Sequence, residues 1–145
     1  MNPREIQAVA GYIIKRFDIT KESLQQMDKL IDRLWYEASI VVDVVDDKRW
    51  LKVANAWFDP VNYQISIPQS LYNALLHKRL TKAKKRAIAI FFHELGHLSL
   101  SHKAVLHHTN ASPTQYEDAE WQADYFADEI LLLMGVQNKK QLTLF

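Results

Sequence analysis

Two histidines four residues apart and a glutamate interrupt a largely apolar stretch, AIAIFFHELGHLSLSH, at residues 87–102, which ends in a third histidine. Residues four apart on a helix share one face, so His93 and His97 can aim both imidazole rings at one point. This is the spacing of a two-histidine metal clamp, and Glu94 would flank it, where a carboxylate can take a proton from water without binding the metal. The alternative interpretation is that the two histidines are structural residues whose ring nitrogens are satisfied by hydrogen bonds.

A catalytic zinc ion usually takes three protein ligands and a water molecule, so the clamp needs a third group. His102 follows His93 by nine residues, a rotation of about 900°, which places it on the opposite face of the same helix. The last predicted helix offers Glu120 and Asp124, four residues apart on one face. One of these carboxylates could bind the metal while the other accepts the N–H of a ligating histidine, which we expect to be His93. The sequence has no cysteine, so any metal must be held by nitrogen and oxygen.

HELGH followed by EWQAD on the next helix resembles the gluzincins, the thermolysin-like class of zinc peptidases. The small size, HELGHLSLSH and EWQADYFADEILL are similar, more narrowly, to the ImmA/IrrE-type metallopeptidases over roughly residues 54–134. Two departures are asparagine in many relatives where Asp124 stands, and a proline that often follows the last helix, where this chain has Met134 and Gly135.

The resemblance implies a zincin-like fold and one Zn²⁺ per chain. It implies that the metal ligands are His93, His97 and Glu120, that Glu94 is catalytic, and that Asp124 orients a ligand. It also implies a cytoplasmic endopeptidase whose partner is a protein substrate, a helix-turn-helix transcriptional repressor of a phage or mobile element. A membrane partner and direct contact with nucleic acid are not expected.

A peptidase also needs a strand edge that holds its substrate extended. The run Asn55-Ala56-Trp57-Phe58 is similar to the edge strand of thermolysin-like enzymes, so Asn55, Ala56 and Trp57 are candidate substrate-binding residues. Small Ala54 and Ala56 could leave room for a substrate or pack under the helices. The candidates for stabilising a tetrahedral oxyanion are Tyr116, His102, His107 and His108, although the histidines could equally be exposed linker residues.

The order of the helices and strands expected along the chain, which must position these residues, indicates an α+β fold. At 145 residues with 48% apolar content, the chain suits one domain over residues 1–145. We expect a helical pair within residues 1–36, metal-binding helices within 81–134 and a polar then apolar tail at 137–145. Between them, strand-like segments at 39–45, 51–58 and 63–67 predict a small, largely antiparallel three-stranded sheet. The helices are predicted at 3–17, from Thr20 through Leu34, at 68–80 and 81–103, and from a capping box at 112–115 to Gly135.

The charges nearly balance, with 18 basic and 17 acidic residues, so no global field favours nucleic acid or a membrane surface. A local basic cluster nevertheless supports a nucleic-acid-binding alternative, or a docking patch for an acidic partner; it comprises Lys78, Arg79, Lys82, Lys84, Lys85 and Arg86. A third interpretation is a zinc-stabilised interaction module, an antirepressor that acts by binding. The apolar tail 142–145 could plug a groove, in which case truncation after Lys140 would raise activity.

Overall fold

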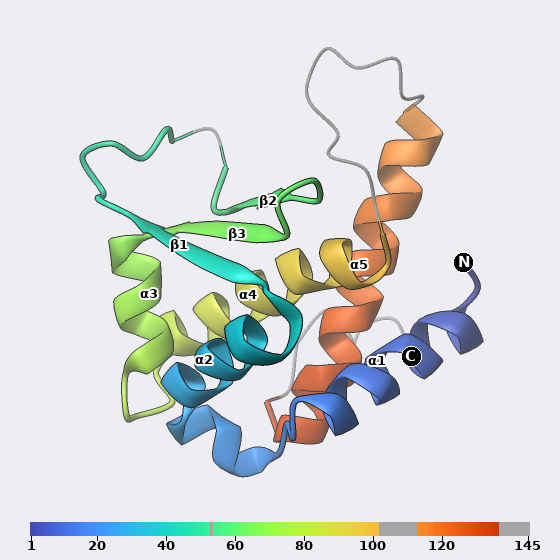
Figure 1. Cartoon of the computed structure of the whole chain (residues 1–145), viewed down its shortest axis with the longest axis horizontal. Coiled ribbons are helices and arrows are strands. Elements are labelled where there is room, and N and C mark those ends of the chain that lie inside the picture. The colour runs from blue at the N-terminus through green and yellow to red at the C-terminus, as the bar shows by residue number, and fades with distance from the viewer. Residues whose placement is uncertain (53, 102–112, 137–145) are drawn as a thin grey trace.

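The computed structural model describes residues 1–52, 54–101 and 113–136, with the backbone alone for 113–117. Within these residues the fold is α+β, as predicted (Figure 1). The elements, in chain order, are α1 (Pro3–Arg16), the 3-10 helix η1 (Lys21–Gln25), α2 (Met27–Ala38), β1 (Val41–Val45), β2 (Trp57–Asp59), β3 (Gln64–Pro68), α3 (Gln69–Leu76), α4 (Lys82–Ser99) and α5 (Pro113–Met134). The single-domain assignment of residues 1–145 stays a prediction.

The three strands form one mixed sheet in the order β1-β3-β2. β2 pairs antiparallel with β3, whereas β1 pairs with β3 in parallel, with Val42 opposite Ile65. The prediction of a largely antiparallel sheet is therefore wrong. The β2–β3 hairpin inserts β3 between the other two strands, and because β2 runs opposite to β1, a strand antiparallel to β2 runs parallel to β1. Consecutive strands are neighbours in the commoner arrangement, which β1 and β2 do not follow.

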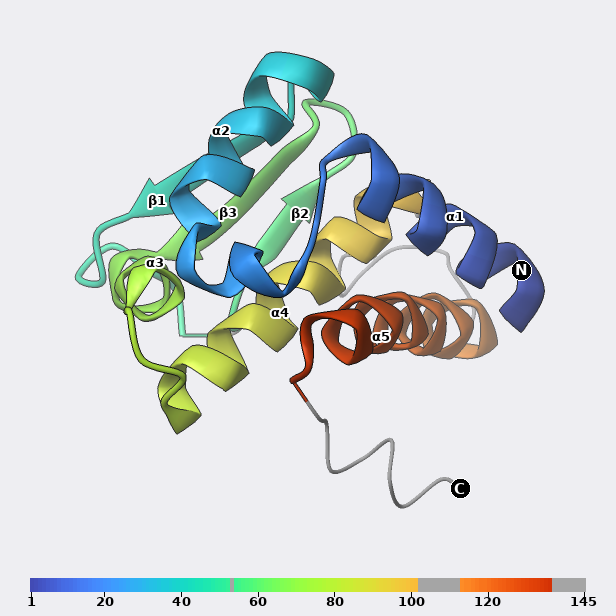
Figure 2. The same ribbon diagram turned by 90° about the horizontal axis from the view of Figure 1, so that it is seen from below.

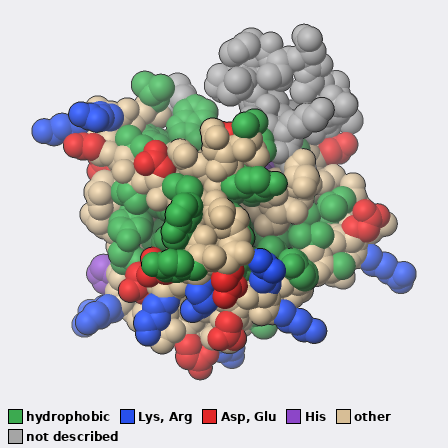
Figure 3. Space-filling model, viewed as in Figure 1, with side chains coloured by type: hydrophobic (Ala, Val, Ile, Leu, Met, Phe, Trp, Pro, Cys, Tyr) green, Lys and Arg blue, Asp and Glu red, His purple; other side chains and the backbone are tan. Residues whose placement is uncertain are grey.

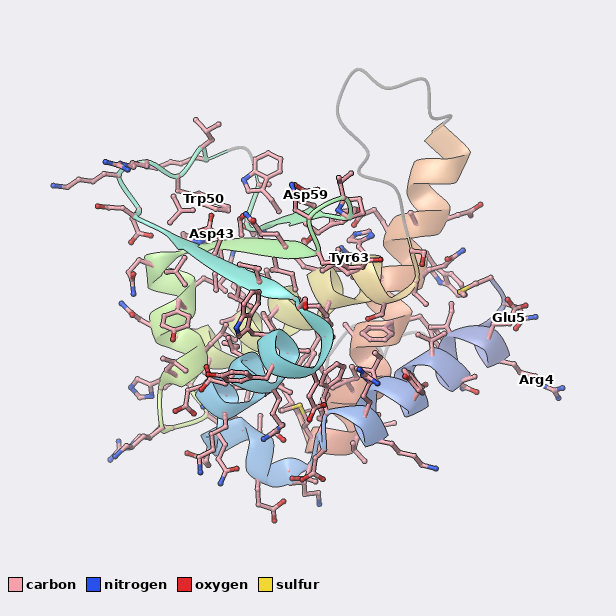
Figure 4. The ribbon with its side chains drawn as sticks, viewed as in Figure 1. Arg4, Glu5, Asp43, Trp50, Asp59 and Tyr63 are labelled. Carbon is pink, nitrogen blue, oxygen red and sulfur yellow. The ribbon has the colours of Figure 1, made fainter. Side chains whose placement is uncertain are left out.

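The second strand is much shorter than the predicted segment 51–58, because β2 begins only at Trp57. The preceding connection closes on itself: the indole Nε1 of Trp50 donates a hydrogen bond of 2.8 Å to the carbonyl of Ala54. Such side-chain to backbone bonds compete with strand pairing. Figure 4 shows Trp50 on this connection and Asp59 at the turn that leads from β2 to β3. Asn55 and Ala56 consequently lie just before the edge strand and not within it.

The helices follow the predicted order with three differences in extent, of which the first is that α3 ends at Leu76 and not at residue 80. Asn2 caps α1 through its side-chain oxygen, which accepts the N–H of Glu5 at 2.9 Å. The second difference is that the helix predicted from Thr20 is split into η1 and α2, because the Ser23 hydroxyl accepts the N–H of Thr20 at 2.9 Å and closes a short local turn.

The third difference is that α4 ends at Ser99 and not near residue 103. Ser101 adopts a φ of 58°, a left-handed conformation that does not continue an α-helix. α5 ends at Met134, and Gly135 with a φ of 79° supplies the predicted stop. The capping box predicted at 112–115 begins outside the described residues.

The helices lie on one side of the sheet, and α5 packs beside α4 with α1 along its other flank (Figures 1 and 2). Ile65 and Ile67 of β3 are fully buried toward this side, together with Phe91 and Phe92 of α4 and Phe126 of α5. Burial of side chains of this size stabilises a fold by about 1.5–3 kcal/mol each. The core therefore fixes α4 between the sheet and α5. None of the described helices combines the length and apolar character that a bilayer-spanning segment needs.

Candidate metal and active site

Two imidazole rings from α4 and one carboxylate from α5 meet at a single point. The Nε2 atoms of His93 and His97 lie 3.1 Å apart. Glu120 lies against both rings, with Oε2 at 2.8 Å from His93 Nε2 and Oε1 at 3.2 Å from His97 Nε2. One ligand atom from each residue lies within 4.8 Å of the others. The structure thus brings together the three residues that the sequence analysis selected as metal ligands.

The donor set and its spacing fit a zinc ion. Nitrogen and oxygen ligands bind zinc at about 2.0–2.2 Å, so neighbouring ligand atoms of a tetrahedral site are about 3.3 Å apart. The contacts of 2.8 to 3.2 Å among these three residues lie close to that separation. Two ring nitrogens that face each other and a carboxylate would share a cation without rearranging the two helices.

Neighbouring side chains orient both rings. Asp124 Oδ1 lies 2.7 Å from His93 Nδ1, so this carboxylate accepts the Nδ1–H and leaves Nε2 directed at Glu120. The His97 ring stacks on Phe58 of β2, with centroids 4.4 Å apart and an interplanar angle of 12°. His97 is buried at 3% side-chain exposure, whereas Asp124 is 64% exposed. Phe58 of the sheet therefore holds the His97 ring in place, and Asp124 of α5 holds the His93 ring.

The electrostatics of the cluster are strongly coupled. Burial disfavours a charged His93, but hydrogen bonds with Asp124 and Glu120 outweigh it and raise the pKa of His93 to about 10. Burial acts against the charge of Glu120 as well, yet the hydrogen bonds from His93 and His97 lower the pKa of its carboxyl well below the ordinary range. Without a metal, the cluster holds a protonated His93 against an ionised Glu120 at neutral pH.

Glu94 lies beside the cluster on α4 in a half-buried position. Burial raises the pKa of Glu94 to about 7, with a smaller upward contribution from Glu120 and an opposing one from His93. A carboxyl group with a pKa near neutrality can both accept and return a proton under physiological conditions. Its position and its proton affinity suit a general base.

Zinc affinity is expected to rise with pH, because zinc requires a neutral imidazole and His93 is protonated at pH 7 in the metal-free protein. Binding should release one proton from His93, and the apparent affinity should increase about tenfold per pH unit between pH 7 and about 9. Competition with a chromophoric chelator at each pH measures this slope.

The control for this prediction is Asp124→Asn, which removes one cause of the raised pKa, so the affinity should stop rising at a lower pH. In the metal-free protein, the raised pKa of His93 stabilises the folded state. This contribution to the free energy of unfolding is complete below pH 6.5 and is lost as the pH rises through about 10. A zinc affinity that does not change over this range would contradict the assignment of His93.

Gly96 allows α5 to approach α4 closely. A Cβ atom at this position would lie 2.9 Å from Phe126 Cδ1 and 3.2 Å from the Ala123 carbonyl oxygen. Ala123 and Phe126 flank Asp124, so the missing side chain sets the depth at which α5 presents its carboxylates. Close approach is thus the reason for a glycine within this helix.

Replacing Gly96 by alanine is expected to destabilise the protein by about 1–3 kcal/mol through overpacking, which exceeds the gain in helix propensity of at most about 1 kcal/mol. Gly11→Ala is the matched control, because a Cβ atom on this α1 glycine meets nothing within 4 Å. It should be neutral or stabilising. Chemical denaturation of both variants measures the difference, and equal effects would show that Gly96 does not set the helix spacing.

The three predicted substrate-binding residues lie in different environments in the structure. Ala56 is buried, so it packs in the core, which is the second of the two expectations for it. Trp57 begins the edge strand β2, with its ring centroid 6.2 Å from that of Trp50. Asn55 is exposed, and its side-chain oxygen accepts a hydrogen bond of 2.9 Å from Arg86. Their roles in substrate binding stay predictions. The side chains of the oxyanion candidates Tyr116, His102, His107 and His108 lie outside the described residues.

The basic cluster at the start of α4 is smaller than its sequence indicates. Lys84 is 1% exposed, and its Nζ donates to the carbonyls of Leu24 and His77, so this residue ties α4 to η1 and to the end of α3. Burial lowers the pKa of Lys84. Its inclusion in a surface patch is therefore wrong, because two backbone carbonyls satisfy the ammonium group inside the protein.

Two contacts of the site escaped the sequence analysis: the stack of Phe58 on His97, and the hydrogen bond from Arg86 to Asn55. The position of Arg86 in the sequence carries part of this signal. It precedes His93 by seven residues, and this spacing places both residues on the same helix face. Nothing in the sequence indicates which strand residue faces His97.

An α+β fold with a two-histidine, one-carboxylate cluster defines a protein with a candidate metal-dependent site. The family model of the IrrE N-terminal-like domain, peptidase family M78, matches residues 57–133, which is more than half of the chain and includes β2, α4 and most of α5. The chain belongs to this family, which confirms the resemblance and supports a peptidase-type function. No curated protein and no solved structure gives a significant match.

Proposed function

We propose that the protein is a zinc-dependent endopeptidase with a zincin-like core, in which His93, His97 and Glu120 hold one Zn²⁺. The single observation that carries this proposal is the convergence of three ligand atoms, from two helices, within 4.8 Å of one another. Structural histidines need only one hydrogen-bond partner each, whereas here both Nε2 atoms point at the same carboxylate. The family supports the same class of chemistry.

When bound, zinc supplies a Lewis acid that polarises the scissile carbonyl and makes water more acidic. Glu94 accepts a proton from the attacking water as the new C–O bond forms, and it later transfers that proton to the amine nitrogen as the C–N bond breaks. Asp124 keeps the His93 ring in one tautomer throughout. The buried residues Phe91, Phe92 and Leu95 limit the access of solvent on the core side of α4.

Support for a protein substrate comes from the edge strand. β3 pairs with one side of β2, and within the described residues no strand pairs with the other side. An extended peptide can add to such an edge through backbone hydrogen bonds. We propose that the substrate is a helix-turn-helix repressor of a phage or mobile element, which acts as a separate protein in the cytoplasm. This proposal rests on the family resemblance.

A second function remains a candidate, namely a zinc-stabilised interaction module that acts by binding. It is favoured because Glu120 and Asp124 of α5 both contact His93 of α4. A metal bound between these helices would stabilise the fold whether or not the protein cleaves peptides. The nucleic-acid alternative is weaker, because Lys84 is buried. Basic and acidic side chains are also interspersed on the face shown in Figure 3.

The test of the proposed function is cleavage of a repressor encoded by a neighbouring gene. We expect fragments to appear with the zinc-loaded protein and to be absent after chelation, with activity restored by one equivalent of zinc. Mass spectrometry of the products gives the cleaved bond. Binding of the intact repressor without fragments would favour the interaction module.

A further inference from the structure

A cavity of about 610 Å³ lies between α3, the first turns of α4 and the connection from β1 to β2. It is separate from the three proposed metal ligands, none of which lines it. The lining residues that matter here are Trp50, Lys52, Asn55, Ala83, Arg86 and Ala87. Neither the proposed chemistry nor the metal cluster requires a hollow at this place.

The cavity and the metal cluster lie along the same side of α4. Arg86 precedes His93 by seven residues, which is two helical turns, so both side chains lie on one face and about 10 Å apart along the axis. The strand side shows the same order: Asn55 contacts Arg86 at 2.9 Å, and Phe58 stacks on His97. The segment 55–58 therefore runs along α4 from the cavity to the cluster.

This geometry determines how many substrate residues separate the cleaved bond from the side chain that reaches the cavity. An extended peptide advances about 3.3 Å per residue. If its scissile bond lies at His93 and His97, the residue about three positions away reaches Arg86. Exposed Arg86 and the small residues Ala83 and Ala87 then form one wall of the space available to that side chain.

The charge of the cavity indicates what that side chain is. Arg86 and Lys52 are exposed cations, and the contact of Arg86 with Asn55 engages a neutral amide oxygen. Asp47 is the one acidic residue among the described lining residues, and its Oδ1 already accepts the N–H and the hydroxyl of Ser70 at the start of α3. The cations thus exceed the acid by one charge, beside the apolar ring of Trp50.

We propose that this cavity is a specificity site that takes an acidic side chain, aspartate or glutamate, about three residues from the cleaved bond. The guanidinium of Arg86 would bind the carboxylate, and Trp50 with the two alanines would contact the aliphatic part. The proposal rests on the proposed function for the position of the scissile bond. It names the substrate class: peptide segments with an acidic residue at a fixed distance from the cleavage site.

The test measures binding separately from turnover. Fluorescein-labelled nine-residue peptides carry Glu, Gln or Lys three positions before or after the central bond, and fluorescence anisotropy gives their affinities for the zinc-loaded Glu94→Gln protein. In one of the two registers we expect the Glu peptide to bind about fivefold more tightly than the Gln peptide, with the Lys peptide weakest, which is the size expected of an exposed ion pair.

Three further variants identify the residue responsible. Arg86→Gln retains a hydrogen-bond donor for Asn55 but removes the charge, and it should abolish the preference for Glu. Arg86→Glu should favour the Lys peptide instead, and Lys52→Glu should shift the preference in the same direction without touching the contact with Asn55. Zinc content serves as the control for folding of each variant.

Equal affinity for the Glu, Gln and Lys peptides in both registers, or no measurable binding of either acidic peptide, would overturn the proposal. So would a preference for Glu that survives in Arg86→Gln. Cleavage of the same peptides by the unmodified protein separates the two ideas. A preference without cleavage would contradict the proposed function alone, whereas cleavage without a preference would contradict the specificity site alone.

Discussion

Replacing Glu94 by glutamine is expected to lower the rate of peptide hydrolysis by at least about a hundredfold, the size typical of a lost general base, while leaving zinc bound. Glutamine has nearly the same shape but cannot accept a proton from water at neutral pH. Glu94 is not among the three residues whose ligand atoms converge, so the metal should stay. Repressor cleavage and zinc content, measured on the same preparation, check both halves of the expectation.

The matched control is Glu37→Gln, which makes the same chemical change at an exposed position on α2. It should alter neither quantity. If Glu94→Gln kept full cleavage, the proton-transfer role would be wrong. If the biological effect on the repressor survived without cleavage, the interaction module would be the better account.

Replacing Glu120 by alanine is expected to reduce zinc affinity by more than about a hundredfold, because loss of an outer-sphere partner alone costs 10- to 100-fold and a direct ligand contributes more. The substitution removes the carboxylate that lies within 3.2 Å of both ring nitrogens. It also removes one of the causes that raise the pKa of His93. Competition with a chromophoric chelator at pH 7.5 gives the affinity.

Asp118→Ala on the same helix is the control, since Asp118 is exposed and is not part of the cluster. It should bind zinc as the unmodified protein does. An unchanged affinity in Glu120→Ala would mean that some other group supplies the third ligand.

The pairing of His93 with His97 could be predicted from sequence because the helix alone decides it: a spacing of four residues fixes two side chains on one face. The choice between Glu120 and Asp124 could not be derived in that way. Both lie on one face of α5, and the packing of α5 on α4 places Glu120 at the two Nε2 atoms and Asp124 at Nδ1 of His93. The family resemblance, not the spacing, indicates Glu120.

The errors in the fold have a common origin in long-range contacts. The parallel pairing of β1 with β3 depends on where a hairpin inserts, and the short β2 depends on the bond from Trp50 to Ala54. Lys84 illustrates the same limit for charge, because a lysine at a helix start is ordinarily exposed. Here two carbonyls from η1 and the end of α3 accept its ammonium group.

The most direct test of the central claim is X-ray absorption at the zinc edge of the protein loaded with one equivalent of zinc. We predict a first shell of nitrogen and oxygen at about 2.0–2.2 Å, with the outer-shell scattering of two imidazole rings, and the loss of this spectrum in Glu120→Ala. Failure to bind one zinc ion, or a shell that contains fewer than two imidazoles, would contradict the site described here.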